Sequence, residues 1–441
     1  MKKRIEVCLI GCLISFGLFA QDQFWTLDDC IRYAIDHNLN IHQMKLQQSN
    51  AEINLNTAQM SRLPDLNASI SPNWKFGYVP SENNVSAHTK ATQNTGFSVG
   101  SSLPLFSGFR ISNEIAKNKL DLAAATQDLQ KAQEDIALNV TYLFLQVLFN
   151  KELMKVNEQQ VDLTKKQVEK TKALTNAEKV PRSQLYDMEA QAAKDEVALI
   201  QAKNNVDLAL LDLAQSLELS GEIVFDIVSP ETDREDLNAT LQPISSIYAN
   251  ALNIKPEIKA QSYRIAGAEK SKSIAQSAYW PTLSLSMGYG TSYFYNYNNN
   301  TNAAFSQQIR DWGSEYIGLT LNIPIFNRFS VRNQVRSAQL NIDNRQWELE
   351  KAKKTLYKEI QTAFLNATAA QQKFAASEKA VKASTESFQY AQERYEVGKS
   401  SVFEFNEAKN RLIQSQSELI QAKYDYIFRC KILAFYNGEV L

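Results

Sequence analysis

Four segments of the chain alternate apolar and polar residues over lengths typical of strands that cross an outer membrane. The first covers residues 64–78, the second residues 96–105, and two more lie within residues 281–326. Successive side chains of a strand point to opposite faces of its sheet, so each strand has one apolar face and one polar face. The lengths are close to the ~9 to 11 residues of a tilted membrane strand. We expect two β-hairpins, at 64–106 and 281–326.

The other segments have the apolar spacing of long helices. Each half of the chain is expected to hold a helix before its β-hairpin, a long helix after it, and a return helix behind a tight turn. The expected ranges are 27–60, 111–175 and 182–219 in the first half, and 247–277, 331–397 and 402–435 in the second. At 1.5 Å per residue the two long helices are on the order of 100 Å long. Heptads sustained over such lengths predict antiparallel coiled coils.

The chain contains an internal duplication. The segment "AEINLNTAQMSRLPDLNAS" from Ala51 aligns with "AEKSKSIAQSAYWPTLSLS" from Ala268, and "LPLFSGFRISNEI" from Leu103 aligns with "IPIFNRFSVRNQV" from Ile323. Repeats of this kind indicate one structural unit that is used twice. We therefore divide the chain into a first repeat over residues 21–220, a linker over 221–243 and a second repeat over 244–441.

The N-terminus has the pattern of a signal peptide. Three basic residues precede an apolar run, and cleavage after Ala20 would leave residues 1–20 outside the mature chain. The apolar run continues past Cys12, which favours this cleavage over lipidation at Cys12, although the sequence leaves lipidation open. Two cysteines remain, Cys30 and Cys430, and the sequence does not say whether they pair.

Charge and motifs argue against nucleic-acid binding and catalysis. The formal net charge is −1, so no basic surface for a nucleic acid is expected. The three histidines, His37, His42 and His88, do not have the spacing of a zinc site. No phosphate-binding glycine loop or nucleophile elbow occurs. We expect no enzyme activity, no metal and no cofactor.

The apolar strand faces need a cover that the helices, already packed in coiled coils, do not supply. For an exported chain, the lipid of an outer membrane would provide it, with Trp74, Tyr78, Tyr293 and Tyr295 at the membrane interface. Four strands leave two open edges, which hydrocarbon does not tolerate, so several copies should share one barrel. Three copies would give twelve strands and a lumen. The alternative is a soluble periplasmic coiled-coil adaptor or scaffold.

Several motifs resemble those of the TolC family of outer-membrane efflux and secretion ducts. They are the two junctions "LPLFSGFR" and "IPIFNRF", the segment "RYEVGKSSVFEFNEAKNRL" from Arg394, and "QAK" on both return helices. The resemblance implies an α+β membrane protein: a homotrimer with a twelve-stranded outer-membrane β-barrel and an α-barrel of coiled coils in the periplasm. It implies the exit duct of a tripartite efflux pump or type I secretion system. Its partners would be a periplasmic adaptor and, through it, an inner-membrane transporter. The sequence does not identify that pump, nor whether the cargo is a drug, a metal ion or a polypeptide.

The same resemblance implies a pore constriction near the second helix turn. Glu404 and Glu407 would face the opening, and their i, i+3 spacing places both carboxylates on one side of a helix. In a trimer they would form two rings that favour cations. In the alignment of the two repeats Asp187 matches Glu407, so Asp187 is a further candidate for the constriction. Tyr395 would help to hold neighbouring helix pairs together.

The resemblance also implies that the two helix turns meet the adaptor. The turns are formed by Val397, Gly398, Lys399 and Ser400 in the second repeat, and by Lys179, Val180 and Pro181 in the first. Two residues depart from the repeat pattern: Arg328 stands where the first repeat has Gly108, and Glu178 stands where the second has Gly398. We therefore expect the first turn to differ from the second.

Overall fold

The computed structural model describes residues 23–79, 88–219, 225–228, 242–297 and 302–439. The expected signal peptide and most of the expected linker at 221–243 lie outside these residues. The chain divides into two compact units. Unit 1 comprises residues 1–41, 133–247 and 360–441, and unit 2 comprises residues 42–132 and 248–359.

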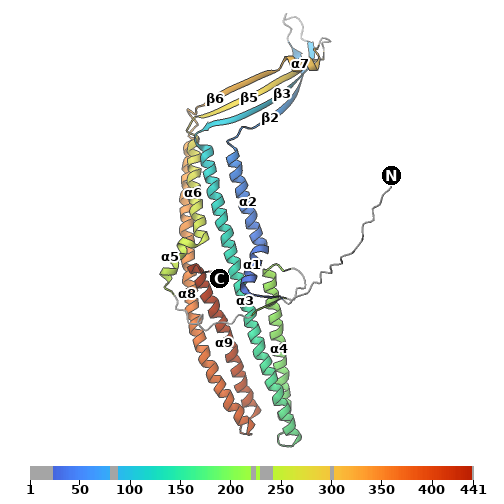
Figure 1. The fold of residues 1–441 in the computed structure, drawn as a ribbon, viewed down its shortest axis with the longest axis vertical. Helices are drawn as coiled ribbons and strands as arrows, with labels where there is room; N and C mark the ends of the chain where they lie inside the picture. The colour runs from blue at the N-terminus through green and yellow to red at the C-terminus, as the bar shows by residue number, and fades with distance from the viewer. Residues whose placement is uncertain (1–22, 80–87, 220–224, 229–241, 298–301, 440–441) are drawn as a thin grey trace, which may run out of the picture. The chain divides into compact units, whose positions relative to one another are not determined.

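Two helical hairpins supply most of unit 1 (Figure 1). The first helical hairpin consists of the end of α3 (Arg110–Asn176) and α4 (Arg182–Ser216), and the second consists of the end of α8 (Ser330–Glu396) and α9 (Val402–Asn437). Helices α3 and α8 each contain 67 residues. The interval from Arg110 to Ser330 equals that from Asn176 to Glu396, and we call residues separated by this interval equivalent.

Each helix that was expected before a β-hairpin is interrupted. Helix α1 (Leu27–His37) ends at Asn38, whose side-chain oxygen accepts hydrogen bonds from the backbone of Asn40 and Ile41 and thereby starts α2 (Leu39–Met60). Helices α5 (Ile244–Ile254) and α6 (Pro256–Ser277) are separated at Lys255, because Pro256 favours the first helical position and disfavours a helical residue before it. The expectation of single helices over 27–60 and 247–277 is therefore wrong.

The core of unit 1 includes a small sheet that the sequence did not predict. Strands β1 (Gln23–Trp25) and β4 (Phe225–Ile227) pair in parallel. Buried residues of α1, α3, α4 and α9 surround β4, and they include Cys30, Phe144, Leu213 and Tyr424. Cys30 and Cys430 are both free thiols, so they do not form a disulfide.

The strands of unit 2 form one antiparallel sheet in the order β2-β3-β5-β6. The strands are β2 (Asn67–Val79), β3 (His88–Ser107), β5 (Thr282–Asn296) and β6 (Ser314–Asn322). Strand β3 begins at His88, so residues 88–95 pair with neighbouring strands and are not the loop that a strand from Gly96 would leave. Strand β6 ends before residue 326, the expected end of the hairpin. A short helix, α7 (Phe305–Asp311), lies between β5 and β6.

The junctions between sheet and long helices have the same backbone conformation despite their different sequences. Gly108 and Phe109 have φ of 61° and 65°, and the equivalent Arg328 and Phe329 have φ of 53° and 60°. A Cβ on Gly108 would lie 2.5 Å from the carbonyl oxygen of Ser277, which explains glycine there. Arg328 adopts the left-handed conformation with a side chain.

Candidate functional site

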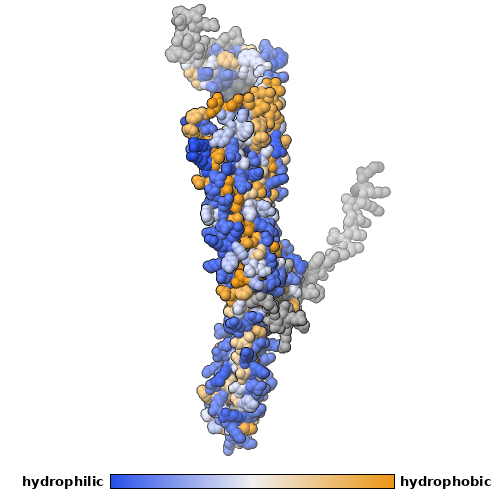
Figure 2. Space-filling model, turned by 90° about the vertical axis from the view of Figure 1, so that its left-hand side faces the viewer, coloured by the Kyte–Doolittle hydropathy of each residue, from blue (hydrophilic) through white to orange (hydrophobic). Residues whose placement is uncertain are grey.

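The strand register places the apolar positions of all four strands on one face of the sheet. Ile70 pairs with Phe97, Val99 with Tyr289, and Leu285 with Leu319. Directly opposed residues share a face, so these pairs form continuous apolar rows. The face is largely uncovered in the single chain: Ile70, Ile317 and Leu319 are 67%, 75% and 67% exposed. Figure 2 shows hydrophobic residues gathered around the sheet of unit 2.

The opposite face of the sheet is polar. It carries Ser69 and Ser98, whose hydroxyls are 2.7 Å apart, and glycines such as Gly288. A Cβ on Gly288 would lie 2.8 Å from the ring of Tyr316, so the glycine makes room for this tyrosine. One apolar and one polar face, each built from alternating residues, are typical of a barrel that separates lipid from a watery interior.

The sheet has two open edges among the described residues, β2 and β6. Strand β6 pairs with β5 only as far as Gly290. Beyond that point, the side-chain amide of Gln308 accepts from Phe294 N at 2.8 Å and donates to Phe294 O at 3.0 Å. Asn302 makes the same two bonds with Asn296, both at 2.9 Å. Side-chain amides therefore replace a neighbouring strand along the end of β5.

Three of the four expected interface aromatics have described side chains. Trp74 and Tyr295 both pair with Gln93 of β3, so they lie in one row across the sheet, on the apolar face. Trp74 is 49% exposed, and Tyr293 packs edge-on against Phe305 of α7. The side chain of Tyr78 lies outside the described part of the chain.

The two helix turns of unit 1 have the same backbone geometry. Glu178 has φ of 58° and Gly398 has φ of 74°. In the first turn Lys179 N donates to Leu174 O at 2.9 Å, and in the second Lys399 N donates to Arg394 O at 2.8 Å. Both are Schellman motifs. The expectation that the first turn differs is therefore wrong, because Glu178 accepts the left-handed conformation.

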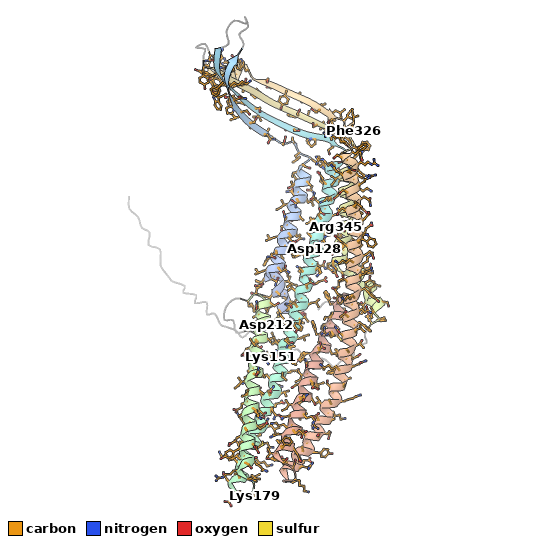
Figure 3. The ribbon with its side chains drawn as sticks, turned by 180° about the vertical axis from the view of Figure 1, so that it is seen from behind. Asp128, Lys151, Lys179, Asp212, Phe326 and Arg345 are labelled. Carbon is orange, nitrogen blue, oxygen red and sulfur yellow. The ribbon has the colours of Figure 1, made fainter. Side chains whose placement is uncertain are left out.

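The turns differ in how they start the return helices. Ser401 caps α9 through a bond from Glu404 N at 3.2 Å, whereas Pro181 precedes α4 without a side-chain cap. Val397 is 67% exposed, Lys399 is exposed, and Val180 and Ser400 are half-buried. Lys179 is exposed at the end of the first helical hairpin (Figure 3).

The structure places Glu404 and Glu407 on the first turns of α9, each beside an arginine. Glu404 accepts a hydrogen bond from Ser400 at 2.5 Å and lies 3.8 Å from Arg394. Glu407 pairs with Arg411 at 2.7 Å. The bond from Ser400, followed by the charge of Arg394, holds the pKa of Glu404 below its ordinary value, so this exposed carboxylate is ionised at neutral pH.

Asp187 and Tyr395 have different surroundings. Asp187 is exposed on α4. The ring of Tyr395 stacks on Phe405 with centroids 5.0 Å apart, and its hydroxyl lies 3.4 Å from that of Thr171 on α3. Tyr395 therefore bridges the two helical hairpins, through a contact that is long for a hydroxyl pair.

A buried charge pair higher in unit 1 joins the same two hairpins. The ammonium of Lys409 on α9 donates to Asp195 on α4 at 2.8 Å and to Thr164 on α3 at 3.0 Å. The side chains of Lys409 and Asp195 are 1% and 8% exposed. Burial opposes ionisation of Asp195, but the bonds from Lys409 and Thr164 hold its pKa below its ordinary value. Burial lowers the pKa of Lys409, against the effect of Asp195.

A second polar link lies further from the turns. Glu152 on α3 accepts hydrogen bonds from Tyr424 at 2.7 Å and from Lys423 at 3.0 Å, both on α9. Neither link was predicted from the sequence. A signal for the first link is present in the spacing: Val402, Phe405 and Lys409 are separated by three and four residues, and Asp195 lies seven residues from the buried Met188 and Ala202. A charged residue in a heptad core position is buried and needs a partner of opposite charge.

Within the described residues, no helix combines the length and apolar content needed to cross a bilayer. The described side chains also include no group of three or more His, Cys, Asp or Glu suited to a metal ion.

Comparison with known proteins decides the family. The profile of the family described as "Outer membrane efflux protein" matches residues 30–218 and 247–434. The chain belongs to the outer membrane efflux protein family. It is 23% identical to "Outer membrane protein TolC" of Escherichia coli over 433 residues, which cover 97% of this chain and 84% of that protein. It is 22% identical to "Outer membrane efflux protein BepC" of Brucella suis, with coverage of 92% and 86%.

Solved structures share the fold. A structure of CusC superposes with a TM-score of 0.78 at 16% identity, covering 94% of this chain and 92% of that one. The outer membrane protein VceC of Vibrio cholerae superposes with a TM-score of 0.74 at 17% identity, with coverage of 94% and 96%. Members of the outer membrane efflux protein family are outer-membrane channels, and this chain is an outer-membrane protein.

Proposed function

We propose that three copies of this chain form the exit duct of a tripartite efflux pump or type I secretion system. The duct would conduct cargo passively from an inner-membrane pump and a periplasmic adaptor to the exterior. One observation carries the proposal: a four-stranded sheet with one uncovered apolar face and two open edges, in a member of the outer membrane efflux protein family. The family favours this function over the alternative of a soluble adaptor or scaffold.

The number of copies follows from the sheet. Open strand edges in hydrocarbon leave backbone groups unpaired, so β2 of one copy would pair with β6 of the next. Two copies would close eight strands, whose interior side chains fill, whereas three would close twelve and leave a lumen. Two repeats per chain then give twelve helical columns below the barrel.

The assembly can be tested on the whole protein. After expression with its signal peptide, the chain should fractionate with outer membranes, migrate as a trimer until it is heated, and conduct ions in planar bilayers. A monomer recovered in the periplasmic extract would contradict the duct and support the scaffold.

Glu404, Glu407 and, less directly, Asp187 would line the periplasmic constriction, and Tyr395 would help to keep it closed. The ionised state of Glu404 supports a cation-favouring ring.

The turns at 179–181 and 397–400 would meet the adaptor. Replacing Val397 or Val180 with Asp should weaken crosslinking to the adaptor without loss of the trimer. Undiminished efflux in the doubly substituted chain would exclude the turns as the docking surface.

A further inference from the structure

Helix α4 carries an apolar seam that its own chain leaves uncovered. Its large members lie at steps of three, eight and eleven, which keep them on one face of the helix, and each is more than half exposed. They are Tyr186, Val197, Ile200, Leu208 and Leu211. The buried residues of α4, such as Asp195 and Ala202, lie on the opposite side of the helix. Asn204 and Asp207 are exposed polar residues within the seam. Two heptad faces on one helix indicate two coiled-coil partners.

Helix α8 carries the matching seam in unit 1. Its exposed members recur at steps of four and seven, and most of them are small. They are Leu365, Ala369, Ala376, Ala383 and Tyr390. Gln372, Lys379 and Glu386 are exposed polar residues within this seam. Helix α8 runs toward its turn and α4 runs away from its own, so two such helices with turns at the same end are antiparallel.

The two seams fit each other in one register. If Asn204 lies opposite Gln372, then Ile200 lies opposite Ala376, and Leu211 lies opposite Leu365. In this register Ile200 meets a small side chain, Leu211 and Tyr186 meet the large Leu365 and Tyr390, and the two amides meet each other. A polar contact of this kind helps to specify register in coiled coils.

The repeat leads to the same register by an independent route. Within the chain, Glu152 of the first helical hairpin accepts from Tyr424 of the second. The residue equivalent to Glu152 is Gln372, and the residue equivalent to Tyr424 is Asn204. The contact between the hairpins of one chain, repeated between chains, therefore places Gln372 of one copy against Asn204 of the next.

The buried charge pair has a counterpart of the same kind. Thr164 and Asp195 are equivalent to Ser384 and Ser415, whose hydroxyls are 2.9 Å apart and buried. Lys409, which completes the first pair, is equivalent to the exposed Glu189. A carboxylate can accept a hydrogen bond from either serine.

We infer that the α4 seam binds the α8 seam of a second copy, with Asn204 against Gln372 of the partner copy and Glu189 against the partner's Ser384–Ser415 pair. The contact joins two different surfaces of the chain and is therefore heterologous. It closes a ring only when the rotation between neighbouring copies is a whole fraction of a full turn. The inference rests on the proposed assembly and adds its residues and register. The same kind of contact between a first and a second helical hairpin then occurs twice for each chain, once within the chain and once with the neighbouring copy.

Cysteine crosslinking tests the register. A chain with Asn204→Cys and Gln372→Cys should form dimers and trimers on mild oxidation of outer membranes. The matched control carries Ala198→Cys and Glu378→Cys. The proposed antiparallel register would place these two exposed residues at one level along the two helices, but they lie outside both seams. The control and the parent chain, with Cys30 and Cys430 only, should stay uncrosslinked.

Three outcomes contradict the inference in distinguishable ways. Trimers that resist crosslinking at the seam pair, or that crosslink equally in the control, would overturn the seam and leave the duct intact. A chain that remains monomeric before oxidation would overturn both proposals.

A charge exchange gives a second readout without cysteines. Asn204→Glu together with Gln372→Glu should lower the fraction of trimer that survives mild heating, because like charges would face each other. Asn204→Lys together with Gln372→Glu should restore most of it. Equal loss in both variants would contradict direct contact between these positions.

Discussion

The two helical hairpins of unit 1 share a backbone but differ in the chemistry between their helices. The first buries Asp195 and Thr164 and receives Lys409 from the second, whereas the equivalent positions of the second carry only the hydroxyls of Ser384 and Ser415. The long helices are equal in length and the two turns share their backbone geometry, so the apolar pattern is enough to specify the hairpin. The polar residues at equivalent positions differ, and this difference distinguishes the first helical hairpin from the second.

The largest expected effect comes from breaking the buried charge pair. Lys409→Met leaves the Asp195 carboxylate buried without its partner, which typically costs about 3–5 kcal/mol. Lys409→Met combined with Asp195→Leu removes both charges, and we expect a much smaller loss. Guanidinium unfolding of the purified protein, followed by circular dichroism, measures both.

The second hairpin provides the control for that experiment. Ser384→Ala removes one hydroxyl from the equivalent pair, and we expect a loss of about 1 kcal/mol. A loss from Lys409→Met that is no larger than this would show that the ion pair contributes no more than the serine pair.

The next effect compares the acidic residues at the starts of the two return helices. Glu404→Lys with Glu407→Lys should reduce or reverse the cation preference of the duct in planar bilayers, because the carboxylates become ammonium groups. The equivalent change in the first hairpin, Gln184→Lys with Asp187→Lys, replaces only one acid and should have the smaller effect. Arg411→Ala should increase cation preference, since Glu407 loses its counter-charge. Equal effects in both hairpins would place the constriction elsewhere.

The two turns allow an exchange at the left-handed position. Glu178→Gly should stabilise the first hairpin by about 1 kcal/mol, because the present side chain is held at φ of 58°. Gly398→Ala should destabilise the second by about 1–2 kcal/mol. A Cβ on Gly398 meets nothing within 4 Å, so the cost would be conformational alone. Thermal unfolding of each variant measures the difference, and opposite signs are the decisive result.

The sequence predicted the features of this fold that depend on periodicity. Alternation located the four strands and assigned their apolar residues to one face, and heptads located α3, α4, α8 and α9. The breaks at Asn38 and Lys255 were missed because they interrupt the helices without interrupting the helical composition. Strand β3 was expected too short, since residues 88–95 are polar and pair only because β2 and β5 lie beside them.

The candidate site was less predictable than the fold. The acids at 404 and 407 and the turn residues came from family resemblance, while their neighbours Arg394 and Arg411 emerged only from the structure. The partner of Lys409 could not be read from the sequence, because Asp195 and Thr164 lie on helices far away along the chain. The contacts between the two hairpins of one chain then indicate, through their equivalent positions, which residues would meet between copies.

The smallest expected effect concerns the hydroxyl of Tyr395. Its distance of 3.4 Å from the Thr171 hydroxyl makes a weak link, whereas the stack of its ring on Phe405 does not depend on the hydroxyl. Tyr395→Phe should therefore change the free energy of unfolding by about 0.5 kcal/mol or less. It should nevertheless raise single-channel conductance if this contact helps to close the duct. The residue equivalent to Tyr395 in the first hairpin is Thr175, which bonds only to its own helix at Thr171 O, so Thr175→Val is the matched control and should leave conductance unchanged. A conductance that responds to neither change would show that the Tyr395 hydroxyl does not help to close the duct.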